Sequence, residues 1–312
     1  MTPSQLCKIE LGHNGLSGAS LRRVAEALGV TIAKLMGESA EELTQVRKAP
    51  AREVGELVRV LVDDLPGAKV SEVEQVARAY EAKLVRAEEG LGVMSQTSLQ
   101  LVYPYGVDEA AAELLARDMR AALGVGCVPV VGLEAVLEMR GVRVVRHAFA
   151  KQFQSGSFFN PQNRVLTIVL NAANTQERND YRLAYELGAA AVFAMSGFGT
   201  IRDEGTVHRL LRRFTAAFLM PEEAVRMDVA RSGIAPDRWT FDLLVMMKSH
   251  FAVSAEAYAL RLESLGLIVP ELRTRLRDRL RAYYRRHPEA MEPQPRDSST
   301  LAILTAVGKG KK

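Results

Sequence analysis

The segment from Ser155 to Ala191 restricts the fold of this chain more than any other part of the sequence. It begins with the pattern of a β-hairpin, in which the turn Asn160-Pro161-Gln162-Asn163 precedes a β-branched run that ends at Asn171. A helix pattern follows, with Thr175 as an N-cap, Glu177 in the first turn and apolar residues at helical spacing. A hairpin that leads into a long helix predicts an α+β fold, and helix patterns elsewhere in the chain make it mostly helical.

Within this predicted helix, Arg182-Leu-Ala-Tyr-Glu-Leu-Gly-Ala189 has the layout of the zinc-binding motif H-E-x-x-H with other residues at both histidine positions. In the working motif, two histidines at i and i+4 bind zinc and the glutamate acts on the metal-bound water. Here Tyr185 and Ala189 stand at the histidine positions, and only Glu186 is retained. A phenol with a pKa of about 10 and a methyl group are not normal zinc ligands at neutral pH. The motif therefore predicts the helix of a zinc peptidase without its metal chemistry.

A second amphipathic helix, Arg213–Met220, follows and is stopped by Pro221. The order of hairpin, first helix and second helix resembles the ImmA/IrrE family of bacterial metallopeptidases, which cleave or inactivate transcriptional repressors, over roughly half of the chain. In that family a glutamate is the third zinc ligand, and His208 stands at its position here. The resemblance therefore implies three former metal positions, namely Tyr185, Ala189 and His208. It implies no metal and no other cofactor, and it leaves Glu186 as a vestige of the catalytic residue.

The residues leave two alternatives open at this site. In one, the chain is an active metallopeptidase that cleaves a repressor, with a shifted metal site rebuilt from His147, Glu204, His208 or His250. In the other, Glu186 and His208 are ordinary polar residues with satisfied hydrogen bonds. The former cleft would then be either an apolar pocket for an effector, or a closed core in which the Tyr185 hydroxyl bonds to one of these two residues.

The first 38 residues carry a second resemblance. Ser4–Gly12 and Leu21–Met36 are similar to the recognition helix and the following helices of an Xre/Cro-type helix-turn-helix domain. This resemblance implies DNA as a partner, contacted through Ser4, Gln5 and Lys8. Because that domain has five helices and this chain begins at about the third, we expect either a translation start upstream of Met1 or a shortened head. An unrelated pair of short helices remains the alternative.

The other patterns predict the domain organisation. After the partial head at 1–38, a helical connector at 39–104 has expected helices at 52–65 and 71–89, the second capped by Ser71. The ImmA/IrrE-like domain is expected at 105–270, and a basic helix with a loose tail at 271–312. Within the ImmA/IrrE-like domain we expect further helices at 107–123, 133–139, 241–250 and 254–266, and a strand at 142–147. The connector helices extend the head, separate the domains or form a homodimer interface.

The positive charge is concentrated at the end of the chain. Residues 271–312 carry eleven Lys and Arg against five Asp and Glu, whereas the whole chain has a net charge of +4. In the expected helix at 272–286, leucines repeat at i+4 and arginines line a neighbouring face, which either contacts nucleic-acid phosphates or lies in solvent.

Composition and length are compatible with an intracellular regulator. The 312 residues suffice for about two domains, and the two cysteines form no CxxC pair, which indicates a reducing compartment. The sequence shows no signal-peptide pattern and no apolar run long enough for a membrane span. We therefore predict a cytoplasmic DNA-binding transcriptional regulator that does not associate with membranes. Its ImmA/IrrE-like domain would be catalytically dead and serve as a sensor or interaction domain for a protein partner or a small-molecule effector.

Overall fold

A computed structural model describes residues 57–62, 67–91, 96–101, 103, 105, 106, 108, 110–130, 132–150, 152–195 and 204–286 of the chain. The expected head at 1–38, the linker at 39–51 and the tail after Arg286 lie outside the described residues, as do Ser4, Gln5 and Lys8. Contacts divide the chain into two units, one of residues 1–52 and 89–93 and the other of residues 53–88 and 94–312. The elements below belong to the second unit, except for the C-terminal end of α5.

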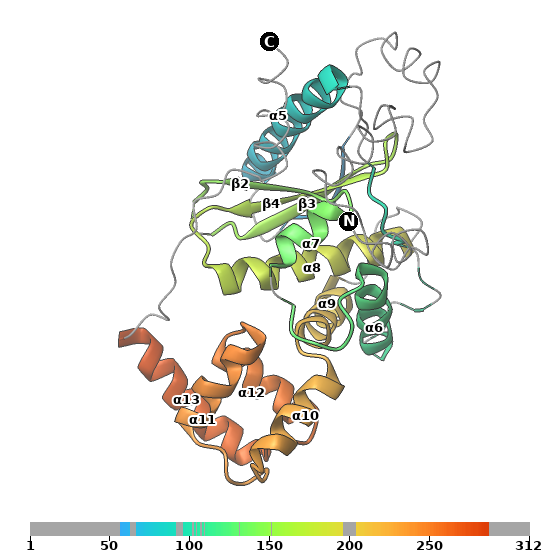
Figure 1. The fold of residues 1–312 in the computed structure, drawn as a ribbon. Coiled ribbons are helices and arrows are strands. Elements are labelled where there is room, and N and C mark those ends of the chain that lie inside the picture. Colours follow the sequence, from blue (N-terminus) through green and yellow to red (C-terminus); the bar gives the residue numbers. More distant parts are fainter. Residues whose placement is uncertain are drawn as a thin grey trace, which may run out of the picture. The chain divides into compact units, whose positions relative to one another are not determined.

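The described elements confirm the expected α+β fold, which is mostly helical (Figure 1). In chain order they are β1 (Val58–Val62), α5 (Gly67–Leu91), α6 (Ala111–Leu123), α7 (Leu133–Met139), β2 (Arg143–His147), β3 (Ser155–Asn160), β4 (Val165–Asn171), α8 (Gln176–Met195), α9 (Glu204–Leu219), α10 (Glu222–Ser232), α11 (Phe241–Lys248), η1 (Ser249–Phe251), α12 (Ala255–Ser264) and α13 (Pro270–Arg286). No described helix combines the length and the apolar character that a membrane span requires.

The sheet has the strand order β1-β3-β4-β2. Strands β3 and β4 form the expected hairpin, with Asn160 opposite Val165, and β2 runs parallel to β4. Every residue of β3 and β4 is buried. Both faces are covered because α5 packs on one face and α8 on the other (Figure 1). The strand period of two separates the faces, so that Ile168 packs in the cluster with α8 while Val169 packs in the cluster with α5.

A buried ionic network joins α5 to the sheet. The Arg143 guanidinium on β2 binds the Glu81 carboxylate and also lies 2.8 Å from that of Glu88, both on α5. The Thr167 hydroxyl on β4 donates a hydrogen bond to Glu81. Burial raises the pKa of Glu81, although the Arg143 charge opposes the shift. Because a buried carboxylate is costly without a partner, this network fixes the position of α5 on the sheet.

Two expectations for the connector were wrong. The segment expected as a helix at 52–65 contains strand β1, an edge strand that pairs with β3. The run Val58-Arg-Val-Leu-Val62 is too short for its apolar residues to distinguish the helix period from the strand period. The three valines favour a strand. Helix α5 begins at Gly67 and ends at Leu91, so that Ser71 lies inside the helix and is not its N-cap.

The helices of the remaining chain follow the expectations more closely. Helix α7 has the predicted bounds, and Ser254 caps α12 by accepting a hydrogen bond from Ala257 N at 3.2 Å. Helix α9 ends before Pro221 as expected. The buried Arg261 guanidinium bonds to Met220 O at 2.9 Å and to the Glu113 carboxylate, which ties α12 to the end of α9 and to α6.

Candidate functional site

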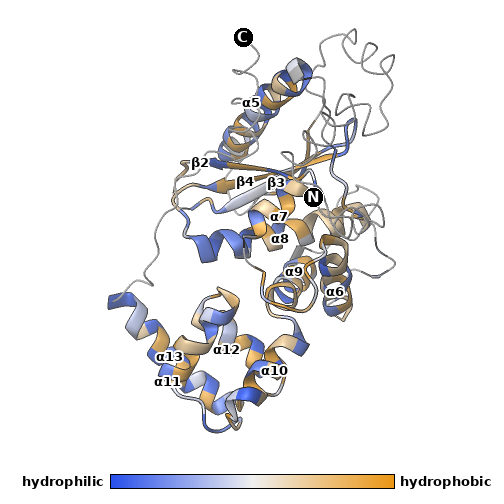
Figure 2. Cartoon of the chain, viewed as in Figure 1, coloured by the Kyte–Doolittle hydropathy of each residue, from blue (hydrophilic) through white to orange (hydrophobic). Residues whose placement is uncertain are grey.

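Helix α8 carries the two former metal positions predicted within the motif. Its first turn is capped as predicted, since Thr175 Oγ1 accepts a hydrogen bond from Arg178 N at 3.2 Å. Figure 2 shows the helix as hydrophilic at its N-terminal end and hydrophobic over the rest of its length. All residues from Leu183 to Ala194 are buried, because the sheet covers one side of α8 and helix α9 another. Tyr185, Glu186 and Ala189 therefore all lie at core positions.

A close contact between α8 and α9 defines the spacing at the site. A Cβ atom built on Gly188 would lie 2.5 Å from the Phe214 ring, which is closer than packed carbon atoms approach. Only glycine therefore allows the two helices to pack at this distance. Phe214 is fully buried and its ring lies 5.7 Å from that of Phe218, so α9 contributes an aromatic core beneath the former metal positions.

The Glu186 carboxylate is fully buried and directed at strand β3. Its Oε1 accepts a hydrogen bond from Ser155 Oγ at 2.6 Å, and its Oε2 accepts one from Ser157 Oγ at 2.5 Å. The two serines lie two residues apart on the strand, so both hydroxyls face the same side of the sheet. Both carboxylate oxygens are thus used in structural hydrogen bonds.

Sequence reasoning missed these two serines. Ser155 and Ser157 are both fully buried in a strand that is buried at every position. Two hydroxyls at alternate positions of a fully buried strand need a buried partner. That requirement was the signal in the sequence that could have predicted a polar group on the helix facing the strand.

Tyr185 and His208 are brought together by α8 and α9. The Tyr185 hydroxyl lies 2.5 Å from His208 Nδ1, and the two rings are inclined by 17° with their centroids 6.4 Å apart. On the other side, the Tyr181 ring lies 6.2 Å from the Tyr185 ring at an interplanar angle of 20°. The Arg182 guanidinium lies over the Tyr185 ring, 5.7 Å from its centroid. Two of the three former metal positions therefore bond to each other.

The third former metal position offers no donor at all, since Ala189 is buried and carries only a methyl group. Zinc sites in proteins use three or four ligands drawn from His, Cys, Asp and Glu. A phenol that bonds to the neighbouring imidazole, together with a methyl group, does not supply such a set. The residues at the three former metal positions thus do not fit zinc.

The three histidines of the alternative set are not brought together, and the Glu204 side chain lies outside what the structure describes. His147 is exposed at the end of β2 and its ring contacts Phe149, with centroids 4.8 Å apart. His250 Nδ1 lies 2.9 Å from Asp228 Oδ2, whereas His208 contacts Tyr185. Within the described ranges, no group of three His, Cys, Asp or Glu side chains is placed to hold a metal ion.

One further carboxylate on α8 has a strongly shifted pKa. Burial raises the pKa of Asp180 from 3.8 to about 6, although a hydrogen bond from the Gln176 amide at 2.9 Å opposes the shift. Asp180 lies five residues before Tyr185, near the hydrophilic end of the helix. The sequence pattern did not single it out, because Asp in the first turns of a helix is common on solvent-exposed faces.

Comparison with known proteins supports part of the sequence analysis. The family model of the IrrE N-terminal-like domain matches residues 137–263 of the chain. A search of the curated proteins found no match to this chain. The matched region includes the hairpin, Glu186 and all three former metal positions. The predicted ImmA/IrrE-like domain is therefore present, over less than half of the chain, and the expected head at 1–38 lies outside the match.

Proposed function

We propose that this chain is a cytoplasmic DNA-binding transcriptional regulator. In this proposal its IrrE/ImmA-like domain has lost peptidase chemistry and acts as a sensor or interaction domain for an effector or a protein partner. The observation that carries the proposal is the use of the former catalytic groups in the core. Glu186 is held by Ser155 and Ser157, and Tyr185 bonds to His208.

Peptide hydrolysis requires a nucleophile and a group that takes up its proton. Glu186 is poorly suited to this role, because it is 0 % exposed and both of its oxygens accept hydrogen bonds from serines. A substrate could approach this carboxylate only after α8 separated from β3. A domain with the fold of a peptidase and its former catalytic groups in the core is better suited to binding than to hydrolysis.

The DNA-binding part of the proposal comes from the sequence of the head. Gln5 and Lys8 lie three residues apart, about one helical turn, near the start of the expected recognition helix. A lysine there would contact phosphate, and a glutamine could pair with an adenine edge. The described residues include none of this segment, so the support is the resemblance alone.

The loss of metal chemistry is tested by elemental analysis and a proteolysis assay on the purified full chain. We expect zinc far below one atom per chain, and no digestion of casein or of a candidate repressor with or without added zinc. A stoichiometric zinc content together with proteolysis that Glu186→Gln abolishes would overturn this part of the proposal.

DNA binding is tested by mobility shift on the region upstream of the chain's own gene. The full chain and a version extended into the reading frame before Met1 are compared. Lys8→Ala should weaken binding to all sequences and reduce the salt slope by about one unit, whereas Gln5→Ala should relax sequence preference. Arg231→Ala, on the exposed surface of α10, serves as a charge-matched control that should change neither property. If neither chain binds DNA at low salt, the regulator proposal is wrong.

A further inference from the structure

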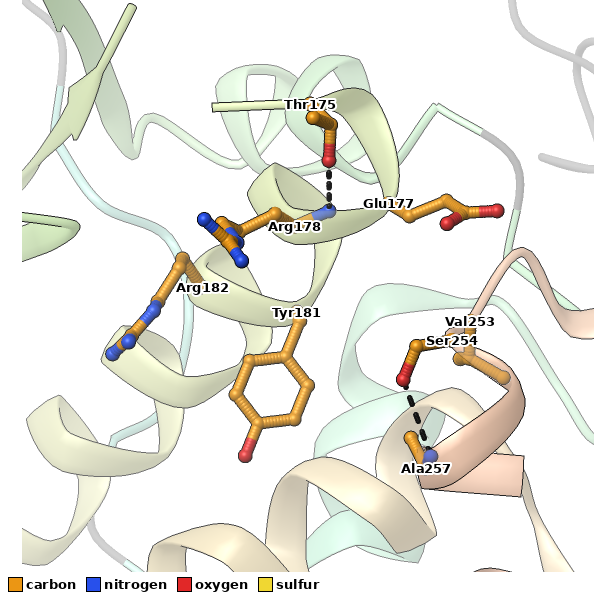
Figure 3. A pocket seen from close by; sticks show the side chains of 8 residues that line it. All are labelled: Thr175, Glu177, Arg178, Tyr181, Arg182, Val253, Ser254 and Ala257. Atoms are coloured by element: carbon orange, nitrogen blue, oxygen red, sulfur yellow. Dashed lines mark hydrogen bonds between the residues drawn. The ribbon is translucent and has the colours of Figure 1, made fainter. Parts of the chain in front are cut away.

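A pocket of about 280 Å³ lies beside the hydrophilic end of α8 (Figure 3). One wall is the first two turns of this helix and the residue before it, and the other is the start of α12. The lining residues are Thr175, Glu177, Arg178, Tyr181, Arg182, Val253, Ser254 and Ala257. The pocket begins one helical turn before Tyr185, since Tyr181 lines it and stacks on the Tyr185 ring. It is therefore a neighbour of the former metal positions and does not include them.

The charges around the pocket favour an anion. Arg178 and Arg182 lie one helical turn apart and extend from the same side of α8 (Figure 3). The acidic lining residue, Glu177, is bound by Lys248 from α11 at 3.1 Å. The Arg178 guanidinium has no acidic partner within the part of the chain that the structure describes. Lys248 thus offsets the Glu177 charge, and Arg178 and Arg182 add two guanidinium groups to the lining of the pocket.

Hydroxyl groups add further donors. Thr175 and Ser254 are both N-cap residues, and each accepts a backbone hydrogen bond at 3.2 Å, from Arg178 N and Ala257 N respectively. A hydroxyl that accepts a hydrogen bond keeps its own hydrogen for donation. The pocket thus lies between the N-terminal ends of two helices, where the partial charge is also positive. Tyr181, Val253 and Ala257 supply an aromatic and apolar surface beside these donors.

We propose that this pocket binds a small organic anion, with a carboxylate or phosphate group held by Arg178 and Arg182 and a compact apolar or aromatic body beside Tyr181. Guanidinium groups form the strongest hydrogen bonds to these two anions. The pocket lies just below the range of about 300–1,000 Å³ for drug-sized ligands, which limits the ligand to a compact molecule.

A small organic anion would be the effector of the sensor domain, and this role rests on the proposed function. Tyr181, Tyr185 and His208 form a stacked column from the pocket to helix α9. Arg182 lines the pocket and also lies over the Tyr185 ring. A ligand that binds Arg182 and Tyr181 would therefore act directly on the contacts at the former metal positions.

Isothermal titration calorimetry on the purified full chain tests the binding. The probes are phenyl phosphate and benzoate, which share an aromatic ring and differ in the anion, and benzyl alcohol is the neutral control. We expect at least one of the two anions to bind, more weakly as salt is raised, and benzyl alcohol to bind at least tenfold more weakly. The stronger of the two identifies the anion that the pocket prefers.

Two sets of variants assign any binding to this pocket. The double variant Arg178→Gln/Arg182→Gln should weaken binding at least tenfold, whereas Arg231→Gln/Arg275→Gln, which removes the same charge from exposed sites on α10 and α13, should not. Ala257→Phe keeps every charge but fills the space, and it should also weaken binding at least tenfold while the circular dichroism spectrum stays native.

Several outcomes would overturn the inference. They are the absence of heat with either anion at millimolar concentration, equal binding of benzyl alcohol, and unchanged affinity in the Arg178/Arg182 double variant or in Ala257→Phe. The titrations contain no DNA and no peptide substrate. A failure here therefore leaves the proposed regulator untouched, and a failure of DNA binding leaves the pocket untouched.

Discussion

Removal of the Tyr185 hydroxyl tests whether the former metal positions are now part of the core. Tyr185→Phe keeps the ring, which is 5 % exposed, and deletes the 2.5 Å hydrogen bond to His208 Nδ1. A net hydrogen bond contributes about 0.5–1.5 kcal/mol, and a buried partner left unsatisfied costs about 1–3 kcal/mol. Because His208 is half-buried and can regain water, we expect a loss of about 1 kcal/mol in the free energy of unfolding.

A second tyrosine provides a matched control. The Tyr258 hydroxyl is buried and has no hydrogen-bond partner among the described residues. Tyr258→Phe removes the same atom but no hydrogen bond, so the free energy of unfolding should stay equal or rise. Tyr185→Ala deletes the whole ring from the core and should cost about 3–5 kcal/mol, the usual range for truncation of a buried aromatic side chain.

Urea denaturation measures these differences with two probes. The chain has one tryptophan, Trp239, which is 3 % exposed, so its fluorescence reports on the packing around α12. Circular dichroism reports on all helices, and coincident transitions would support a two-state analysis. In thermal scans, 1 kcal/mol corresponds to a shift of roughly 2–4 °C for a domain of 150–250 residues. If Tyr185→Phe loses no more stability than Tyr258→Phe, the Tyr185–His208 bond does not hold α8 to α9 and the argument fails.

Variants of three further buried groups, at Arg143, Asp180 and Glu186, are compared with an exposed control at Arg226. Arg143→Met leaves two buried glutamates without their partner and should cost about 3–5 kcal/mol, whereas Arg226→Met breaks an exposed ion pair and should cost about 0–1 kcal/mol; equal losses in urea would contradict the buried network. The pKa of Asp180 is raised from 3.8 to about 6, so the folded chain holds the proton more tightly and loses stability as pH rises between these values. The stability advantage of Asp180→Asn should therefore grow from about pH 4 to about pH 6 and then level off, and a pH-independent difference would refute the assignment. Glu186→Gln should cost less than about 1 kcal/mol, because serine hydroxyls can donate or accept, and a larger loss would show that the charge itself is needed.

The parts of the fold that were predictable are those in which local chemistry and burial agree. The turn at Asn160–Asn163 fixed the hairpin, Thr175 fixed the start of α8, and Pro221 fixed the end of α9. Each of these residues restricts the backbone through its own side chain or ring, so its effect does not depend on the rest of the chain. Helix α7 was predicted with its observed bounds because it is flanked on both sides by glycines, which adopt the left-handed backbone conformation readily.

The elements that were mispredicted depend on contacts with distant segments. Strand β1 owes its conformation to pairing with β3, about 100 residues later, which no local pattern contains. Helix α5 begins at Gly67, before Ser71, so that Ser71 is an interior residue. Burial of Val73 and Ala77 against the sheet stabilises this helix more than a serine cap would. Tertiary packing thus overrode local propensity in both places.

In the candidate site too, local features were predictable and contacts with distant segments were not. The positions of Tyr185, Glu186 and Ala189 on α8 were predictable from the motif spacing, because a helix fixes which residues share a face. The partners of these residues were not, because Ser155 and Ser157 come from the sheet and Lys248 from α11. The pocket beside Arg178 also escaped prediction, since its second wall comes from a helix about 75 residues later in the chain.

The contacts of Glu186 give it a structural role that does not depend on catalysis. The Glu186 carboxylate satisfies two serine hydroxyls that are buried in strand β3. Replacing it with an apolar residue would leave both hydroxyls without a partner in the core, at a cost of about 1–3 kcal/mol for each. The glutamate of the motif is therefore no evidence of peptidase activity in this chain. The two motif positions beside it differ from those of a zinc site, since Tyr185 bonds to His208 and Ala189 carries only a methyl group.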